Sequence, residues 1–305
     1  MTRKLLFIVG PTAAGKSAVA HMAAPALGAE IVAMDSMTVY RGMDIGTAKP
    51  APAERKRFHY HLIDAIDPEE YFSVGRYLAL VKAALAGIDA RGSTPLFVGG
   101  TPLYLRALTR GFFRGPPGDR EIRDRLRAEA AETGAPVLHA RLARIDAEAA
   151  GRIHPNDLRR IVRALEVYEL VGMPISELQA LSPALADGRG ASMWGLEWSR
   201  ERLYERIEAR VDAMFEAGFI EEVRGLVERG ALGPQSSKAL GYAQAAEHLA
   251  GRLTLDEARK VTKLETRRFA KRQMTFFRTF PEIRWIEVTG QADLEAAAEI
   301  IINDQ

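Results

Sequence analysis

Eight residues near the start of the chain combine the groups that bind a phosphate. They read Gly-Pro-Thr-Ala-Ala-Gly-Lys-Ser and directly follow the apolar run Leu5–Val9. In a P-loop of this kind the glycines let the backbone curl around an anion, and the following helix N-terminus adds positive potential. We therefore predict a diphosphate- or triphosphate-binding loop made of Gly10, Pro11, Thr12, Ala13, Ala14, Gly15, Lys16 and Ser17.

Two side chains of this loop have separate expected roles. Lys16 brings a mobile cation to the terminal phosphate, and the Ser17 hydroxyl can ligate Mg²⁺. Mg²⁺ is therefore the expected cofactor. The loop predicts that a phosphate binds and leaves open whether it is transferred.

A carboxylate follows the second apolar run. Asp35 could hold Mg²⁺ through water or accept a proton from an attacking group. The third run continues into Gly99, Gly100 and Thr101, with no acid where a P-loop ATPase or kinase usually carries one. Asp35 would then do the acid–base work alone, unless it only caps a turn or a helix. The small residues of 41–50 would suit a close backbone approach to a ligand.

Alternating apolar and helical stretches should position these groups. We expect strands at Leu5–Val9, Glu30–Met34, Pro95–Val98, Ser192–Glu197 and Arg284–Val288. Helical stretches such as Ala18–Leu27, Val74–Arg91 and 200–280 separate or follow them. This order predicts an α/β fold, a P-loop kinase-like parallel sheet whose strand ends carry the site.

Between the third and fourth expected strands the chain is helical. Turn-rich breaks at Arg114–Gly118 and Ser182–Gly190 bound this region. Its expected helices are Arg120–Thr133, Pro136–Arg144, Asp146–Arg152 and Asp157–Val171. We interpret residues 117–191 as an all-helical insertion domain in a core made of residues 1–116 and 192–305.

Composition narrows the class of protein. The chain has 305 residues, 47% of them hydrophobic, which supports a sizeable core. It has no cysteine, which excludes disulfides and thiolate zinc sites and makes the reducing cytoplasm the expected compartment. The first apolar run is shorter than that of a signal peptide, and none approaches a membrane span.

Basic residues gather in two stretches. Residues 110–163 hold twelve arginines, and Lys263–Arg278 holds six basic residues interleaved with Phe269, Phe276 and Phe277. These stretches could hold RNA, but helical arginines often pair with nearby acids and helical aromatics often lie in a core. His59 and His61 alternate as on a strand, yet no third metal ligand is evident, so we expect no metal there.

The ordered motifs resemble the tRNA dimethylallyltransferase family. After the P-loop they are Asp35-Ser36 with 40–50, Val98–Thr101 with Leu103-Tyr104, His154–Asp157 with Arg163–Val167, Ala239–Tyr242, and Thr266–Arg268 with Ala270–Gln273. The resemblance implies transfer of a dimethylallyl group from dimethylallyl diphosphate to N6 of adenosine 37, 3′ to the tRNA anticodon. The P-loop would hold the pyrophosphate leaving group rather than ATP, in a kinase-like core with a helical insertion.

The resemblance also implies roles for single residues. Asp35 would take the proton from the adenine amine, and Arg210 would clamp the pyrophosphate; Thr101 is placed with them among the catalytic residues. The implied tRNA contacts are Asp35, Ser36, Met37, Thr38, Thr101, Arg123, Arg159, Arg160, Ile161, Val162 and Arg163. One departure from the family is visible: Thr38 stands where many members carry Gln. Ser17 stands where the family often has Thr.

Other functions remain open from the residues. A P-loop small-molecule kinase would use the insertion as a lid, and an isopentenyltransferase of free adenylates would need no extended basic surface. A tRNA-binding module without activity would have no use for Lys16, Asp35 and Arg210. For the favoured reading we expect a target base flipped out of the anticodon loop. The expected partners are tRNA and dimethylallyl diphosphate, with no membrane and a monomeric chain.

Overall fold

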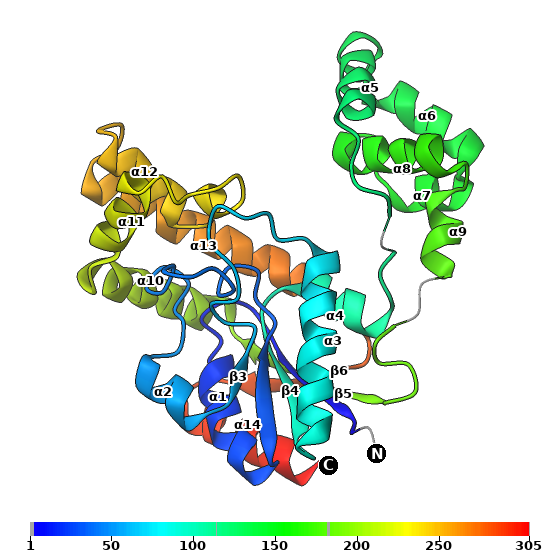
Figure 1. Ribbon diagram of the computed structural model, residues 1–305. Coiled ribbons are helices and arrows are strands. Elements are labelled where there is room, and N and C mark those ends of the chain that lie inside the picture. Colours follow the sequence, from blue (N-terminus) through cyan, green and yellow to red (C-terminus); the bar gives the residue numbers. More distant parts are fainter. Residues whose placement is uncertain (1–2, 114, 182–183, 305) are drawn as a thin grey trace. The chain divides into compact units, whose positions relative to one another are not determined.

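A six-stranded parallel sheet lies at the centre of the larger part of the molecule (Figure 1). The computed structural model describes residues 3–113, 115–181 and 184–304. Arg114 and Ser182, where the two expected breaks begin, lie outside the described residues. The chain divides into a larger unit, residues 1–106 with 186–305, and a helical unit, residues 107–185.

The strand order places the P-loop strand inside the sheet. The order is β3-β2-β4-β1-β5-β6. The strands are β1 Leu5–Val9, β2 Ala29–Ala33, β3 Tyr60–His61, β4 Thr94–Gly99, β5 Ala191–Trp198 and β6 Ile283–Val288. Ile8 of β1 lies between Val98 of β4 and Trp194 of β5. Because all strands are parallel, the exits of β1, β2 and β4 share one edge of the sheet.

The expected α/β fold is confirmed. Strand β1 matches its expected bounds, and the other four expected strands differ by at most one residue at each end. The two-residue edge strand β3 was not anticipated, because so short a segment carries no periodic pattern. Helix α14 was also missed.

Helices cover the sheet on both faces. In the larger unit they are α1 Lys16–Ala26, α2 Pro52–Arg57, α3 Val74–Ala90, α4 Pro102–Thr109, α10 Arg200–Glu216, α11 Phe219–Glu228, the 3₁₀ turn η1 Ser236–Lys238, α12 Tyr242–Leu249, α13 Leu255–Phe277 and α14 Gln291–Asn303. Side chains of β1, β4 and β5 that point to one face, such as Leu6 and Ile8, join the core formed with α1 and α14. Phe7 and Phe97 point to the opposite face and stack with ring centroids 4.9 Å apart.

The helical unit has a core of its own. Its helices are α5 Arg120–Thr133, α6 Ala135–Ile145, α7 Ala147–Arg152, α8 Leu158–Val171 and α9 Ile175–Ala180. Asp119, Asp146 and Asp157 cap the N-termini of α5, α7 and α8 through side-chain bonds to backbone amides. Two of these aspartates were expected inside the helices rather than at their caps.

The helical unit of the structure spans 107–185, whereas the sequence suggested 117–191. The difference at its C-terminal end has a physical cause. Arg189 forms an ion pair with Asp89 of α3 at 2.5 Å, and the Leu5 amide donates to the Gly190 carbonyl at 3.1 Å. The two contacts attach the segment before β5 to α3 and to β1, both in the larger unit. Among the described residues, no helix combines the length and the apolar character needed to cross a bilayer.

Candidate active site

The P-loop has the curled backbone that an anion site requires. Gly10 and Gly15 have φ angles of 146° and 91°, and Ala13 adopts a left-handed φ of 63°. A left-handed non-glycine residue costs on the order of 1 kcal/mol and is common at ligand sites. The Lys16 ammonium folds back and donates to the Pro11 carbonyl at 2.7 Å. The amides that open α1 have no partner within the helix, so they can receive an anion.

Two side chains that the sequence did not indicate donate hydrogen bonds to backbone carbonyls of this loop. Trp198, the last residue of β5, donates its indole N–H to the Ala14 carbonyl at 3.0 Å. Arg206 of α10 donates to the Ala13 carbonyl at 2.9 Å and lies 4.3 Å from the Trp198 ring. These contacts satisfy the Ala13 and Ala14 carbonyls with donors from the protein. The loop pattern gives no signal for them, because they come from distant segments.

The structure gathers three of the predicted charged groups. Burial and, to a smaller extent, the nearby Arg210 charge lower the pKa of Lys16 to about 8, against the raising effect of Asp35. Burial also lowers the pKa of Arg210, against the attraction of Asp35. Two cations and one carboxylate therefore share a partly desolvated site with net positive charge, which suits a polyanion.

One carboxylate oxygen of Asp35 accepts hydrogen bonds, and the other has no hydrogen-bond partner among the described residues. Its Oδ1 accepts from the Met37 amide at 2.8 Å and from the Thr38 amide at 3.4 Å. The turn role considered as the alternative is therefore real. No described residue hydrogen-bonds Oδ2, so Asp35 can orient itself with one oxygen and take a proton with the other.

The exit of β4 lies against the exit of β2. The Thr101 amide donates to the Met34 carbonyl at 3.2 Å, which puts Thr101 next to Asp35 in space. A Cβ on Gly99 would lie 2.0 Å from that same carbonyl oxygen. No side chain fits at this strand end, which gives a physical reason for the missing acid.

An aromatic group, Phe72, Tyr77 and Tyr104, borders the Asp35 site. The rings of Tyr77 and Tyr104 stack 3.8 Å apart, and Phe72 meets both edge-on. Burial raises the pKa of both tyrosines, and the Asp35 charge adds to the rise. The Tyr77 hydroxyl is buried without a hydrogen-bond partner among the described residues. Only Tyr104 appeared in a sequence motif; the other two lie in segments without one.

The loop of residues 41–50 is held by the protein itself. Glu222 accepts from the amides of Asp44, Ile45 and Gly46 at 2.9, 2.7 and 3.3 Å, and from the Tyr242 hydroxyl at 2.6 Å. A Cβ on Gly46 would lie 2.4 Å from the Tyr242 ring. The close approach that this glycine allows is therefore to protein side chains, where the sequence suggested a ligand.

Arg123 and Arg163, two predicted tRNA contacts, face a buried acid. Glu166 has no exposed surface and forms ion pairs with Arg123 at 2.8 Å and Arg163 at 2.7 Å. Burial opposes ionisation, but hydrogen bonds from Arg163, Arg123 and the Asp119 amide hold the pKa of Glu166 below its ordinary value. The Arg123–Glu166 pair therefore joins α5 to α8, whereas Arg163 pairs with Glu166 within α8.

The other predicted tRNA contacts differ in exposure. Ile161 and Val162 belong to the apolar core of the helical unit, so their side chains face away from solvent. Arg159 and Arg160 are exposed, and Arg160 pairs with Asp157 at 3.2 Å. Arg159 forms no ion pair within the described residues. Ser36 and Met37 are partly exposed, whereas the buried Thr38 hydroxyl has no hydrogen-bond partner among the described residues.

The two histidines near β3 meet an acid that the sequence did not reveal. Glu30 Oε2 lies 2.7 Å from His61 Nε2 and 3.4 Å from His59 Nδ1. Arg91 donates to both Glu30 oxygens, at 2.8 and 2.7 Å. This hydrogen bonding, against the effect of burial, lowers the pKa of Glu30 to about 2. Because Arg91 already compensates the carboxylate, the cluster is an ion-pair network at the sheet edge.

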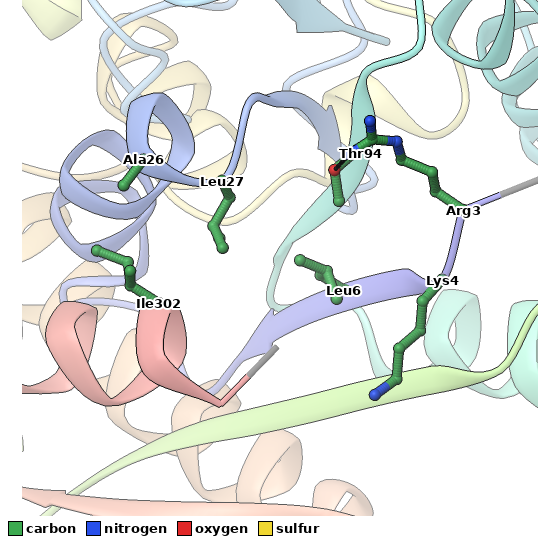
Figure 2. A pocket seen from close by; sticks show the side chains of 7 residues that line it. All are labelled: Arg3, Lys4, Leu6, Ala26, Leu27, Thr94 and Ile302. Carbon is green, nitrogen blue, oxygen red and sulfur yellow. Dashed lines mark hydrogen bonds between the residues drawn. The ribbon is translucent and has the colours of Figure 1, made fainter.

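Seven residues line a surface hollow of about 540 Å³ (Figure 2). Leu6 and Thr94, near the starts of β1 and β4, line it. The Arg3 guanidinium bonds the Thr94 hydroxyl there at 3.1 Å. This hollow contains none of the predicted site residues.

Comparisons with known proteins agree with the geometry. The IPP transferase family model matches residues 38–280, and the isopentenyl transferase model matches residues 3–65. The chain belongs to the IPP transferase family. It is 47% identical over 300 residues to the tRNA dimethylallyltransferase of Pelotomaculum thermopropionicum, covering 97% of this chain and 95% of that protein.

Solved structures extend the family resemblance to the fold. The full-length tRNA isopentenylpyrophosphate transferase of Bacillus halodurans matches with a TM-score of 0.71 at 39% identity, covering 99% of this chain and 97% of that one. A eukaryotic dimethylallyltransferase acting on tRNA matches with a TM-score of 0.81 at 27% identity, covering 98% and 78%. The resemblance drawn from the ordered motifs is confirmed.

Proposed function

We propose that this chain transfers a dimethylallyl group from dimethylallyl diphosphate to N6 of the adenosine 3′ to the tRNA anticodon. One observation carries the proposal: the P-loop, Lys16 and Arg210 gather beside Asp35, at a β4 exit that admits no acid. A phosphoryl-transfer site of this class uses an acid there to hold its metal. The tRNA dimethylallyltransferase relatives support the same conclusion.

The chemical step needs a base and an accurate position. The adenine amine is a weak nucleophile because its lone pair is delocalised into the ring. N6 attacks C1 of the allyl group, the C1–O bond breaks with its electron pair leaving on pyrophosphate, and the N6 proton passes to Asp35. Holding the amine against C1 and placing the free Asp35 oxygen within reach of the proton lower the barrier.

The remaining charges act on the leaving group. Negative charge grows on the diphosphate as the C1–O bond breaks. That charge is stabilised by the amides that open α1, the Lys16 ammonium and the Arg210 guanidinium. Electrostatic stabilisation is stronger in a partly desolvated site than in water.

The start of α1 also fits a magnesium ion. The Ser17 side chain is exposed and bonds no described residue, and its hydroxyl is an oxygen ligand of the kind Mg²⁺ accepts. When bound, Mg²⁺ would neutralise part of the diphosphate charge. Ser17 would hold it, and Lys16 and Arg210 would hold the phosphate oxygens.

Recognition of RNA would use surfaces of both units. A base inside the anticodon loop must be flipped out to reach Asp35, and the aromatic group offers an apolar wall for the adenine ring or the allyl chain. The exposed Arg159 is suited to a phosphate. We also propose that the enzyme works in the cytoplasm, where a chain without cysteine needs no disulfide, and as a monomer.

The test is the transfer of label from dimethylallyl diphosphate. An unmodified tRNA with adenosine after the anticodon should become labelled, and a matched tRNA with guanosine there should not. Labelling of free AMP instead of tRNA would favour a free-adenylate isopentenyltransferase. No transfer to either acceptor by folded protein would refute the proposal.

A further inference from the structure

Gln273, on α13, reaches two backbone groups of the active site at once. Its side chain is buried, with 3% of the residue exposed. Its Oε1 accepts from the Thr12 amide at 2.9 Å, and its Nε2 donates to the Gly100 carbonyl at 2.6 Å. An N–H needs an acceptor and a carbonyl needs a donor, so the partners fix the orientation of the amide. Gln273 thus joins the P-loop to the exit of β4.

The Gln273 amide also occupies the space of an absent side chain. A Cβ on Gly100 would lie 2.5 Å from Gln273 Nε2 and 3.4 Å from the Gly10 carbonyl oxygen. Related P-loop enzymes direct an acid from this strand end toward their metal. Here a neutral amide from a helix more than 170 residues away in sequence fills the place.

The same contacts continue toward the base. Gly100 precedes Thr101, whose amide donates to the Met34 carbonyl at 3.2 Å, and Met34 precedes Asp35. Hydrogen bonds therefore run from the phosphate loop through Gln273 and the β4 exit to the segment that carries Asp35. The separation between leaving group and base depends on this chain of contacts.

We propose that Gln273 is a positioning residue that holds the P-loop and the Asp35 segment at the distance the transfer needs, without placing a negative charge beside the departing pyrophosphate. This role rests on the proposed prenyl transfer. A carboxylate at position 273 would face the Gly100 carbonyl without a donor and would repel the leaving group. An apolar side chain of equal length would leave the Thr12 amide and the Gly100 carbonyl unpaired.

The experiment compares Gln273→Met, Gln273→Glu, Gly100→Ala and the double variant Gly100→Ala/Gln273→Met with the wild type. The readouts are the single-turnover transfer rate, the Kd for tRNA and the Tm. Ser236→Ala is the matched control. The buried Ser236 hydroxyl donates to the Pro68 carbonyl at 2.6 Å and accepts from the Gly233 amide at 2.8 Å, and it touches neither the P-loop nor the β4 exit.

We expect Gln273→Met to slow transfer about 100-fold, the effect of misplacing reacting groups by about 1 Å, and Gln273→Glu to slow it more. The Kd for tRNA should stay within about twofold, since no RNA contact is lost. Gly100→Ala should also slow transfer, because its Cβ displaces the Gln273 amide. The double variant should be no slower than the slower single variant, since both remove one contact.

Three results would overturn the positioning role. Gln273→Met could transfer at the wild-type rate, it could lose only thermal stability as Ser236→Ala does, or the Gly100 and Gln273 effects could multiply. A wild-type chain that transfers nothing would instead refute the proposed function. Should Gln273→Met fail to fold, Gly100→Ala and Gln273→Glu still test the rate.

Discussion

Arg210 in the larger unit and Arg163 in the helical unit are both partly buried arginines, but the fold compensates only one of them. Arg163 pairs with the buried Glu166 at 2.7 Å. Arg210 forms no ion pair or hydrogen bond with the described residues, and burial lowers its pKa. A cation that the fold leaves uncompensated beside a P-loop is available to a ligand, whereas a compensated one stabilises the fold. Both belong to the predicted site, so residue type alone did not separate the two roles.

The largest effect expected from this difference is on Arg210. Arg210→Ala should lower the rate of transfer between 100- and 1,000-fold, roughly the cost of losing one donor to developing charge. Arg163→Ala is the matched control and should keep the single-turnover rate within about threefold. Rapid-quench measurement of labelled tRNA gives both rates. Equal losses of transfer rate in the two variants would contradict the separate roles of Arg210 and Arg163.

The structural role of the paired arginines is tested by replacing their shared partner, Glu166. Glu166→Ala removes the partner of both Arg123 and Arg163 and should lower the free energy of unfolding by about 3 kcal/mol, the usual cost of breaking a buried pair. Urea unfolding followed by circular dichroism measures the change. Unaltered stability would mean that these arginines are not structural.

Replacing Lys16 should raise stability while impairing function, whereas replacing Glu166 should lower stability. Its pKa is about 8 in the fold, against 10.5 for an ordinary lysine. Between these pH values the unfolded chain keeps a proton that the folded chain has released, so the free energy of unfolding rises with pH there. Lys16→Met has no such rise and should be more stable than the wild type at pH 7 by about 2 kcal/mol.

The control for Lys16 is the pH series itself. The stability gap between Lys16→Met and the wild type should narrow from pH 8 to 10.5, while the variant binds inorganic pyrophosphate poorly at every pH. Thermal unfolding with and without pyrophosphate measures both quantities. A gap that does not change with pH would contradict the lowered pKa.

The smallest expected effect concerns Arg159, an exposed arginine at the start of α8 that forms no ion pair with the described residues. Arg159→Ala should weaken tRNA binding a few-fold and reduce the slope of log K against log salt by about 0.7, the value for one lost phosphate contact. Arg160→Ala, which removes a cation already paired with Asp157, should change the slope less. Filter binding over a salt series compares them, and equal slopes would refute the ranking.

Local sequence patterns predicted the strands and loops that position the site. They did not predict the side chains that contact the P-loop from distant segments. The P-loop, Asp35 and the strand ends were readable because each lies at a strand exit with its own sequence pattern. Trp198, Arg206 and Gln273 act on the P-loop from segments more than 180 residues away along the chain. Nothing local in those segments indicates their partners.

The number of arginines in the helical unit did not show which of them pair with acids, and their contact with RNA stays a prediction. The run of arginines suggested an RNA surface, yet Arg123 of α5 pairs with Glu166 of α8, and Arg141 of α6 bridges Glu129 and Glu169. Pairing between helices depends on packing that a single sequence does not reveal. The third member of the histidine cluster, Glu30, was hidden for the same reason, since β3 brings it close only in the fold.

The most direct test of the account is the rate of dimethylallyl transfer by Asp35→Ala, measured in single turnover with the Kd for tRNA on the same protein. The account predicts a rate at least about 100-fold below that of the wild type, the range for a lost general base, with an almost unchanged Kd. A wild-type transfer rate would contradict it, because the amine proton would then have left without Asp35.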